Sequence, residues 1–234
     1  MKINIISFNH RIINIILCFS LLLIFIGCKK SSNEFNIISN TNCYPPCWMN
    51  IIPGKTTKQE VLTLLKGNSL IDTNSIITFG EPWNSFNDVG VFSISSNIEG
   101  NIYFVNDIVV FLGFFGDLNI SFSRAIEELG EPEYIVNIPM NIPNKTNEIF
   151  ALIPKNGINF AYNTHDMGIK SKSEIIPENK ITRVGFFDPS YFDYLLEAGT
   201  FSEGFLDSVQ TKEYMVPWTG YGDIEEKYPP ANIK

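Results

Sequence analysis

Hydrophobic residues recur with a helical period in PGKTTKQEVLTLLKG, residues 53–67. The apolar face of this stretch is made of Val61, Leu64 and Leu65. Thr57 and Glu60 form a T-x-x-E capping box, in which each side chain accepts a hydrogen bond from a backbone N–H of the other residue. Gly67 is suited to ending the helix. The pattern therefore predicts a helix that follows Thr57.

A second stretch with the same period is ISFSRAIEELGEP, residues 120–132. Its apolar face is made of Phe122, Ala125, Ile126 and Leu129, spaced at i, i+3, i+4 and i+7. Ser121 is suited to the N-cap, and Gly130 with Pro132 is suited to stopping the helix. A third, shorter helix is expected after Asp188 and Pro189.

Apolar residues elsewhere come in short runs bounded by turn residues, which predicts strands. The runs after the first helix are residues 77–79, 90–95, 101–105 and 108–115, and those after the second are 134–138, 148–153, 158–162 and 181–187. Asn106-Asp107 and Asn156-Gly157 mark hairpin turns. We therefore expect an α+β fold of two tandem helix-then-antiparallel-strand units, residues 43–118 and 119–187. Their strands would form a sheet with the helices packed on one face, followed by a C-terminal helix and an aromatic tail at 188–234.

The first helix opening also resembles a known family. The pattern P-G-x-T-x-x-E-V-x-x-L-L, which begins at Pro53, is similar to that of the small SmpA/OmlA-type outer-membrane lipoprotein domain. Two such α-plus-sheet units in one chain resemble the tandem architecture of the β-lactamase inhibitor protein. The resemblance implies a protein that works by contact rather than by catalysis, either as a scaffold or as a clamp on another protein.

The N-terminus has the layout of a secretory signal, with Lys2 and Arg11 ahead of an apolar run at residues 12–26. A helix of 15 residues spans about 22 Å, which is less than the roughly 30 Å hydrocarbon core of a membrane. The run ends in FIGC, which resembles the lipobox of bacterial lipoprotein signals. The resemblance implies removal of residues 1–27 and acylation of Cys28. The polar, Ser/Asn-rich composition that follows predicts a tether over residues 28–42. An uncleaved N-terminal helix and ordinary signal cleavage are the alternatives.

Net charge and cysteine spacing add two expectations about the mature chain. Loss of residues 1–27 removes two basic residues and changes the formal net charge from −8 to −10, which disfavours binding to nucleic acid. Cys43 and Cys47, in CYPPCW, would then meet an oxidising environment, so we expect a disulfide between them. Their spacing provides no second pair of ligands for a metal site.

The residues of the mature chain give little sign of catalytic chemistry or of a bound cofactor. His165 is the one histidine after the signal, and the sequence has no G-x-S-x-G elbow and no Gly-rich phosphate loop. Neighbouring carboxylates occur at Glu127, Glu128, Glu131 and Glu133. Paired carboxylates can hydrolyse glycans, but the first two point away from the apolar helix face, which favours a solvated surface.

Aromatic residues are concentrated near the C-terminus, and Tyr214, Trp218 and Tyr221 form a candidate binding surface. The alternative is that these rings cover a sheet face. We expect a lipid-anchored protein of the cell membrane or outer membrane that faces outside the cytoplasm and binds an envelope protein partner without catalysis. A glycan-active or glycan-binding protein and a small-ligand binder with an aromatic pocket are the other hypotheses.

Overall fold

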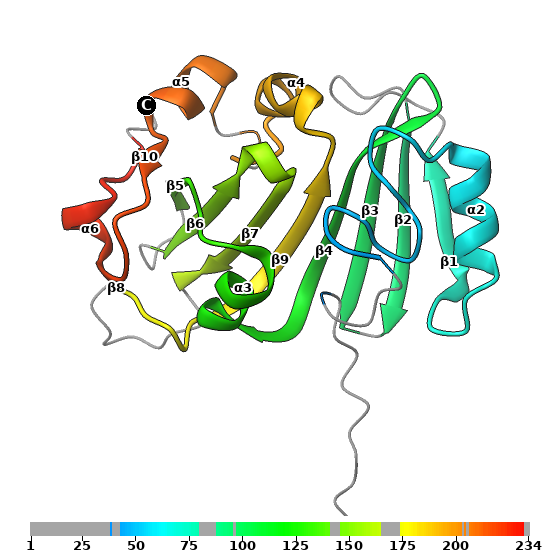
Figure 1. The fold of residues 1–234 in the computed structure, drawn as a ribbon, viewed down its shortest axis with the longest axis horizontal. Coiled ribbons are helices and arrows are strands. Elements are labelled where there is room, and N and C mark those ends of the chain that lie inside the picture. The colour runs from blue at the N-terminus through cyan, green and yellow to red at the C-terminus, as the bar shows by residue number, and fades with distance from the viewer. Residues whose placement is uncertain are drawn as a thin grey trace, which may run out of the picture. The chain divides into compact units, whose positions relative to one another are not determined.

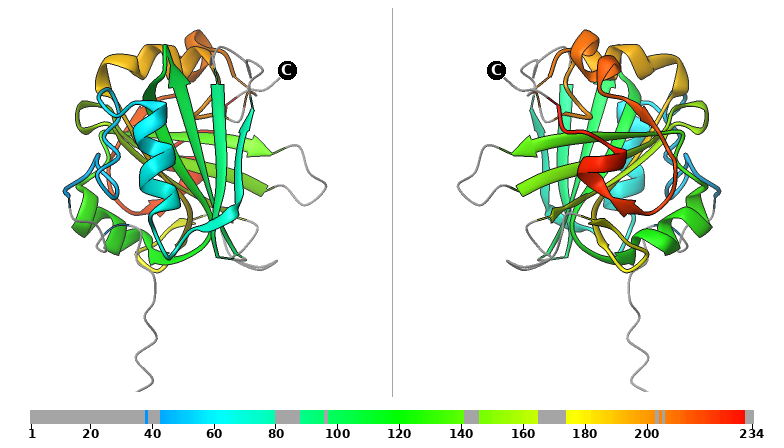
Figure 2. Two further views of the ribbon diagram at one scale, coloured as in Figure 1. Left: turned by 90° about the vertical axis from the view of Figure 1, so that its right-hand side faces the viewer. Right: turned by 90° about the vertical axis from the view of Figure 1, so that its left-hand side faces the viewer.

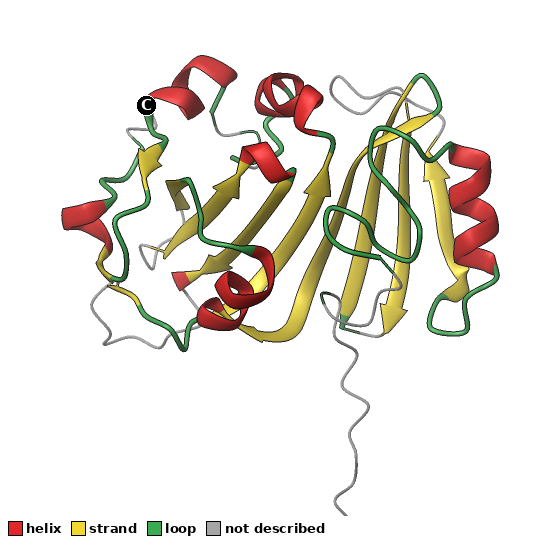
Figure 3. Cartoon of the chain, viewed as in Figure 1, coloured by secondary structure: helices red, strands yellow, loops and turns green. Residues whose placement is uncertain are grey.

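The computed structural model describes residues 38, 43–79, 88–95, 97–140, 146–164, 174–202, 204 and 206–231. The signal, Cys28, nearly all of the tether and His165 lie outside the described residues. The described part mixes a large antiparallel sheet with a few helices and consists mostly of strand (Figure 3).

Nine strands form the main sheet, and every pairing in it is antiparallel (Figure 1). In order across the sheet they are β1 (Asp72–Phe79), β2 (Asp88–Ser95), β3 (Ile98–Val105), β4 (Ile108–Ser121), β9 (Lys180–Phe187), β7 (Ile158–Asn163), β6 (Thr146–Ile153), β5 (Tyr134–Met140) and β10 (Val216–Pro217). A second, two-stranded sheet pairs β8 (Glu174–Ile175) with β11 (Gly222–Asp223).

Short helices surround the main sheet. They are α2 (Lys58–Lys66), α3 (Phe122–Leu129), α4 (Phe192–Glu197), α5 (Ser208–Glu213) and α6 (Ile224–Lys227), with 3-10 turns η1 (Pro154–Asn156) and η3 (Pro189–Tyr191). The end-on views show α2 at one end of the sheet and the segment with α6 at the other (Figure 2).

Local signals in the sequence placed several of these elements correctly. The capping box of Thr57 and Glu60 is present at the start of α2, and Ser121 caps α3 by accepting a hydrogen bond from the Arg124 N–H. Asn106 and Asp107 both have positive φ and join β3 to β4 as predicted. The predicted turn at Asn156-Gly157 lies between β6 and β7, where η1 lengthens the connection.

The expectation of two tandem helix-then-strand units is not met. Strands from both predicted units form one continuous sheet, because β4 pairs with β9 from Phe111↔Phe187 to Ser121↔Lys180. The two stretches of chain therefore share a sheet and a core rather than forming two separate modules.

The expectation that helices pack on one face is also wrong. Phe122 of α3 contacts Phe160 and Tyr162, whereas Leu195 and Leu196 of α4 pack in a cluster with Phe111, Phe150 and Phe187. Phe150 and Phe160 point to opposite faces because Phe150 pairs with Ala161, the strand neighbour of Phe160. Helices thus cover both faces, and we call the face under α4 the cavity face and the other the opposite face.

The segment before α2 covers part of the opposite face. Trp48 is 1% exposed and lies 4.7 Å from Phe114 and 5.8 Å from Phe92, measured between ring centroids. Backbone hydrogen bonds from Gly54 N–H to Val109 O and from Val109 N–H to Thr56 O attach the same segment to the start of β4. Figure 1 shows this segment in blue, crossing β3 and β4.

The capping box gives a first testable prediction. We expect Thr57→Ala to lower the free energy of unfolding by about 1 kcal/mol, since it removes an N-cap. In the matched control Thr63→Ala, within the same helix, we expect a gain of a few tenths of a kcal/mol from the better helix propensity of alanine. Urea unfolding of both variants measures the difference, and equal effects would contradict a role for the cap.

The same box has a pH signature. Hydrogen bonds from the Thr57 backbone N–H and then from its hydroxyl lower the pKa of Glu60 below its ordinary value. The contribution of a carboxylate with a lowered folded pKa is complete above its unfolded pKa and is lost as the pH falls through the folded value. We therefore compare the free energy of unfolding of Thr57→Ala with that of the unmodified protein. The difference should narrow as the pH falls from the unfolded pKa of Glu60 through its lower folded pKa.

Candidate functional site

A cavity of about 310 Å³ lies between the cavity face of the sheet and the segment that follows α4. Strands β3, β4, β6, β7 and β9 supply its sheet side, and Ala198, Gly199, Thr200 and Gly204 supply its cover. Its volume is at the lower end of the range for small-molecule sites, which is about 300–1,000 Å³.

A row of four residues crosses the sheet beneath the cavity. Asn101 on β3 pairs with Gly113 on β4, Gly113 pairs with Gly185 on β9, and Gly185 pairs with Asn159 on β7. Residues that lie directly opposite each other in a sheet share a face, so two asparagine side chains flank two glycines.

The two glycines are needed because the ring of Phe111 lies over both. A Cβ atom at Gly113 would come within 2.6 Å of Phe111 Cε1, and one at Gly185 would come within 2.8 Å of Phe111 Cε2. A Cβ at Gly185 would also collide with Asn159 Oδ1. Any larger residue at these two positions would push the ring or the amide into the cavity.

Three side-chain oxygens of the cavity lining are buried without a hydrogen-bond partner among the described residues. They are Asn101 Oδ1, Asn159 Oδ1 and Thr200 Oγ1. Asn159 is 4% exposed, so bulk solvent does not supply its missing hydrogen-bond partner. These three oxygens are themselves shut off from the open space of the cavity. An unsatisfied buried polar atom costs roughly 1–3 kcal/mol, so each of them is expected to lower stability.

The charged group in the lining is Arg183, and it is held on two sides. Its Nε donates to Glu148 Oε1 at 2.6 Å, and its Cζ lies 5.0 Å from the centre of the Phe115 ring. The Glu148 side chain is 1% exposed, whereas the Arg183 side chain is 26% exposed. The buried carboxylate therefore fixes the guanidinium and largely cancels its charge.

Aromatic rings form the remaining wall. Tyr103 and Phe111 are stacked with centroids 5.1 Å apart, and Phe150 and Phe115 complete the lining. Thr200 is fixed from the other side because its backbone N–H donates to Leu195 O at the end of α4. Gly199 has a φ of 71°, and a Cβ there would lie 2.7 Å from the Cα of Gly204, so the cover turns tightly at this glycine.

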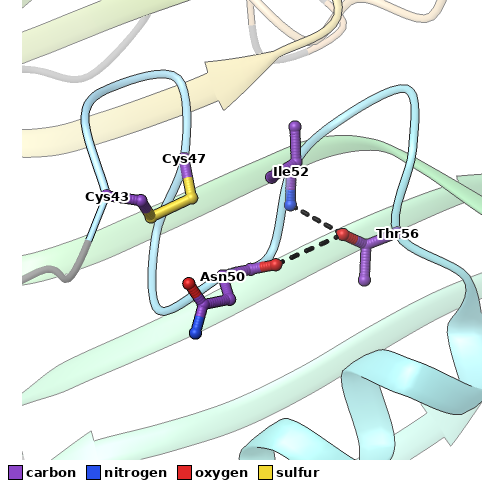
Figure 4. Close-up of a disulfide and its surroundings, with 5 residues drawn as sticks. All are labelled: Cys43, Cys47, Asn50, Ile52 and Thr56. Atoms are coloured by element: carbon purple, nitrogen blue, oxygen red, sulfur yellow. Dashed lines mark hydrogen bonds between the residues drawn. A yellow bond between two sulfur atoms is a disulfide. The ribbon is translucent and has the colours of Figure 1, made fainter.

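The cysteine pair predicted from the sequence is confirmed as a disulfide between Cys43 and Cys47 (Figure 4). The loop that it closes is followed by a turn in which the Ile52 N–H donates to Thr56 Oγ1 at 2.8 Å. Cys47 is buried and Trp48 next to it is inserted into the core, so the disulfide braces the start of the described body.

The predicted aromatic surface is divided by the structure. Trp218 and Tyr221 lie together, 5.6 Å apart, and both contact Phe122 of α3; Trp218 also stacks on the buried Tyr228. Tyr214 instead packs against the cluster under α4. Desolvation, with smaller effects from the Glu178 and Glu131 carboxylates, raises the pKa of Tyr221, which therefore stays neutral near pH 7. Trp218 and Tyr221 therefore cover α3 while Tyr221 stays partly exposed, and the binding surface remains a prediction.

Two of the four predicted carboxylates, Glu128 and Glu133, lie in ion pairs. Glu128 accepts from Arg124 at 2.6 Å one helical turn away, and Glu133 lies 3.5 Å from Lys155. Glu127 is exposed, as expected for a solvated helix face.

Sequence reasoning missed the cavity residues Asn101, Asn159, Arg183 and Thr200. Three of them lie inside apolar strand patterns, in NIYFV, INFAY and ITRVGFF, where a period of two normally places polar residues toward solvent. Here the sheet is covered on both faces. A polar residue within such a strand was the available signal. It indicates a buried polar site only when both faces of the sheet are known to be covered.

The unpartnered amide of Asn159 gives a second testable prediction. We expect the isosteric change Asn159→Leu to raise the free energy of unfolding by about 1 kcal/mol, because it removes a buried group without a partner. The matched control is Asn137→Leu on β5. Asn137 is 1% exposed, and its Oδ1, like that of Asn159, has no partner among the described residues, but its Nδ2 donates to Tyr228 O at 2.8 Å. Because the variant leaves that carbonyl without its donor, we expect a loss of about 1–3 kcal/mol there. Equal losses in the two variants, measured by urea unfolding, would mean that the Asn159 amide is satisfied.

No group of histidine, cysteine or acidic side chains suited to a metal ion occurs within the described residues. None of the helices in the described ranges is long and apolar enough to cross a membrane. No family model, no curated protein and no solved structure matches the chain. The functional assignment therefore depends on the geometry of the cavity and on the sequence of the N-terminus.

Proposed function

We propose that this chain is a lipid-anchored, extracytoplasmic protein that binds a small polar ligand in the cavity without catalysing a reaction. The observation that carries the proposal is the cavity of about 310 Å³, whose described lining combines two asparagines, a threonine and an ion-paired arginine with four aromatic rings. A small ligand with polar and apolar parts would match such a lining.

The chemical groups of the lining favour binding over hydrolysis. The described lining residues contribute amides, hydroxyls, a guanidinium and aromatic rings, and none of them carries a carboxylate. Glycoside hydrolysis typically uses two carboxyl groups about 5–9.5 Å apart on either side of the bond to be broken. Glu148, behind Arg183, is engaged in the ion pair, so its role in this proposal is to position the guanidinium.

The location outside the cytoplasm is part of the same proposal. The charged, apolar and FIGC segments of residues 1–28 support a signal that is cleaved before Cys28 and an acyl anchor on that cysteine. The Cys43–Cys47 disulfide supports an oxidising compartment. Two acyl chains would hold the protein stably at a membrane, where one would not.

A protein partner is the second candidate function. The resemblance of the α2 opening to SmpA/OmlA-type lipoproteins supports a scaffold role, and Tyr221, 37% exposed beside Trp218, supports a contact surface over α3. A surface of this kind would act alongside the cavity rather than in place of it.

The anchor is tested by intact mass. We expect the protein extracted from membranes to have the mass of residues 28–234 plus acyl chains, less two hydrogens for the disulfide. A Cys28→Ser variant should lack the acyl mass and leave the membrane fraction. A native chain that begins at Met1 with a free thiol at Cys28 would contradict the proposal.

Ligand binding is tested by retention. Detergent-solubilised full-length protein is immobilised, and the small molecules of an envelope extract that it retains are identified by mass spectrometry. We expect at least one compound to be retained by the unmodified protein and by Thr63→Val on the surface of α2. The same compound should be lost from Asn101→Leu and Thr200→Val, which replace polar side chains of the cavity lining. Equal retention by all four proteins, or none, would contradict cavity binding.

A further inference from the structure

We infer that the exposed side chains around Tyr221 form a docking surface for a basic segment of another protein, one that carries arginine or lysine. This Tyr221 surface consists of Ile176, Trp218 and Tyr221, with the carboxylates of Glu131 and Glu178 beside it. The inference rests on the second candidate function, the contact surface over α3, and specifies the partner that this surface would bind.

The apolar part of the Tyr221 surface is assembled at the small two-stranded sheet. Gly222 of β11 pairs with Ile175 of β8. The neighbouring residues Tyr221 and Ile176 are therefore brought next to each other at the end of that sheet. Both side chains stay partly exposed, at 37% for Tyr221 and 38% for Ile176, and Trp218 lies 5.6 Å from Tyr221 between ring centroids. Three large apolar side chains thus meet at the surface without being fully buried.

The two rings of this surface are already held in position by the fold. Phe122, which is 0% exposed at the start of α3, contacts both Trp218 and Tyr221. Trp218 also stacks on the buried Tyr228, with the two rings 4° from parallel. Ordered side chains lose little conformational entropy on binding, and tryptophan and tyrosine are enriched among the residues that contribute most to binding energy. The Tyr221 surface therefore has the composition and the order of an interface centre.

The charges around the rings favour a basic partner. Desolvation, and then the Glu178 and Glu131 carboxylates, raise the pKa of Tyr221, so both carboxylates lie near its ring. Both are exposed, and neither of them forms an ion pair with another residue in the described ranges. Glu174 also lies directly opposite Asp223 across β8 and β11, and like charges in this arrangement are destabilising. A positively charged partner would relieve that repulsion.

Basic side chains of the surrounding helices are already engaged within the protein. Lys227 of α6 donates to Tyr221 O at 2.6 Å, and Arg124 of α3 donates to Glu128 at 2.6 Å. A cation supplied by a partner would meet aromatic faces and exposed carboxylates together, and arginine can both stack on an aromatic ring and pair with a carboxylate. Anionic lipid and nucleic acid would instead be repelled by the same carboxylates.

The test selects peptides without assuming their sequence. A random library of peptides of about ten residues is panned against immobilised, full-length protein in a neutral detergent, and the affinity of the enriched peptides is measured by fluorescence anisotropy. We expect these peptides to carry arginine or lysine beside an apolar residue. Their affinity should fall as the salt concentration rises, because the attraction is between exposed charges.

A first pair of variants tests the aromatic part of the surface. Tyr221→Ala should weaken the enriched peptides about tenfold, since it removes the central ring. Tyr44→Ala removes a ring that is 93% exposed in the disulfide loop, and it should leave their affinity unchanged. Thermal unfolding of each variant first establishes that it is folded.

A second pair tests the charges and does not depend on the outcome for Tyr221→Ala. The double variant Glu131→Gln/Glu178→Gln keeps the size of two exposed side chains and should weaken the peptides about tenfold. Its control is Glu99→Gln/Glu213→Gln, at exposed positions of β3 and α5, which changes the net charge by the same amount. The control should leave the affinity unchanged, and equal weakening by both double variants would overturn the proposed site.

The remaining outcomes separate the partner class from the surface itself. Enriched peptides that depend on Tyr221 but lack basic residues would overturn the basic class and leave the contact surface standing; purely apolar peptides of this kind would indicate contact with a membrane. No enrichment, or affinities that are unchanged in both surface variants, would overturn the contact surface as well. Ligand binding in the cavity is judged by the retention experiment, so it does not depend on this result.

Discussion

The arrangement of the described body depends on the pairing of β4 with β9. These two strands are far apart in the sequence, and their register from Phe111↔Phe187 onward joins β1–β4 to β5–β7 in one sheet. The same register places Gly113 opposite Gly185. Without that alignment the two glycines would not lie side by side under the ring of Phe111, and Asn101 and Asn159 would not flank them.

Coverage of both faces of this sheet leaves several polar side chains of its middle strands with little contact with water. Phe122 and Trp48 cover the opposite face, whereas α4 and the turn at Gly199 cover the cavity face. Glu148, 1% exposed, pairs with Arg183, whereas the side-chain oxygens of Asn101, Asn159 and Thr200 are buried without a partner among the described residues. Such oxygens lower stability, while the ion pair keeps the buried carboxylate compensated.

The sequence was informative wherever a structural feature depends on neighbouring residues. Thr57 with Glu60, Ser121 with the Arg124 N–H, and Asn106-Asp107 each act within a few positions, so their residue types were sufficient to predict two helix starts and one hairpin. Cys43 and Cys47 were predictable for the same reason. Features that depend on distant pairing were not predictable: the joining of all strands in one sheet, the placement of helices on both faces, and the meeting of Asn101 with Asn159.

The role of the C-terminal aromatic residues could not be predicted from the sequence either. Composition alone could not separate a contact surface from a covering layer, because Trp218 and Tyr221 would look alike in both. Their contacts with Phe122 and Tyr228 depend on where α3 and α6 lie. The residues of the cavity lining are likewise individually unremarkable in the sequence.

Amide hydrogen exchange of β4 and β9 in the full-length protein tests the central claim most directly. Because each strand is paired on both sides, we expect the amides of Leu112–Phe114 and Val184–Phe186 to be among the slowest to exchange, with protection close to that of global unfolding. Rapid exchange across both segments, while β2, β3, β6 and β7 stay protected, would show that β4 and β9 do not pair in solution. The shared sheet and the cavity built on it would then both be wrong.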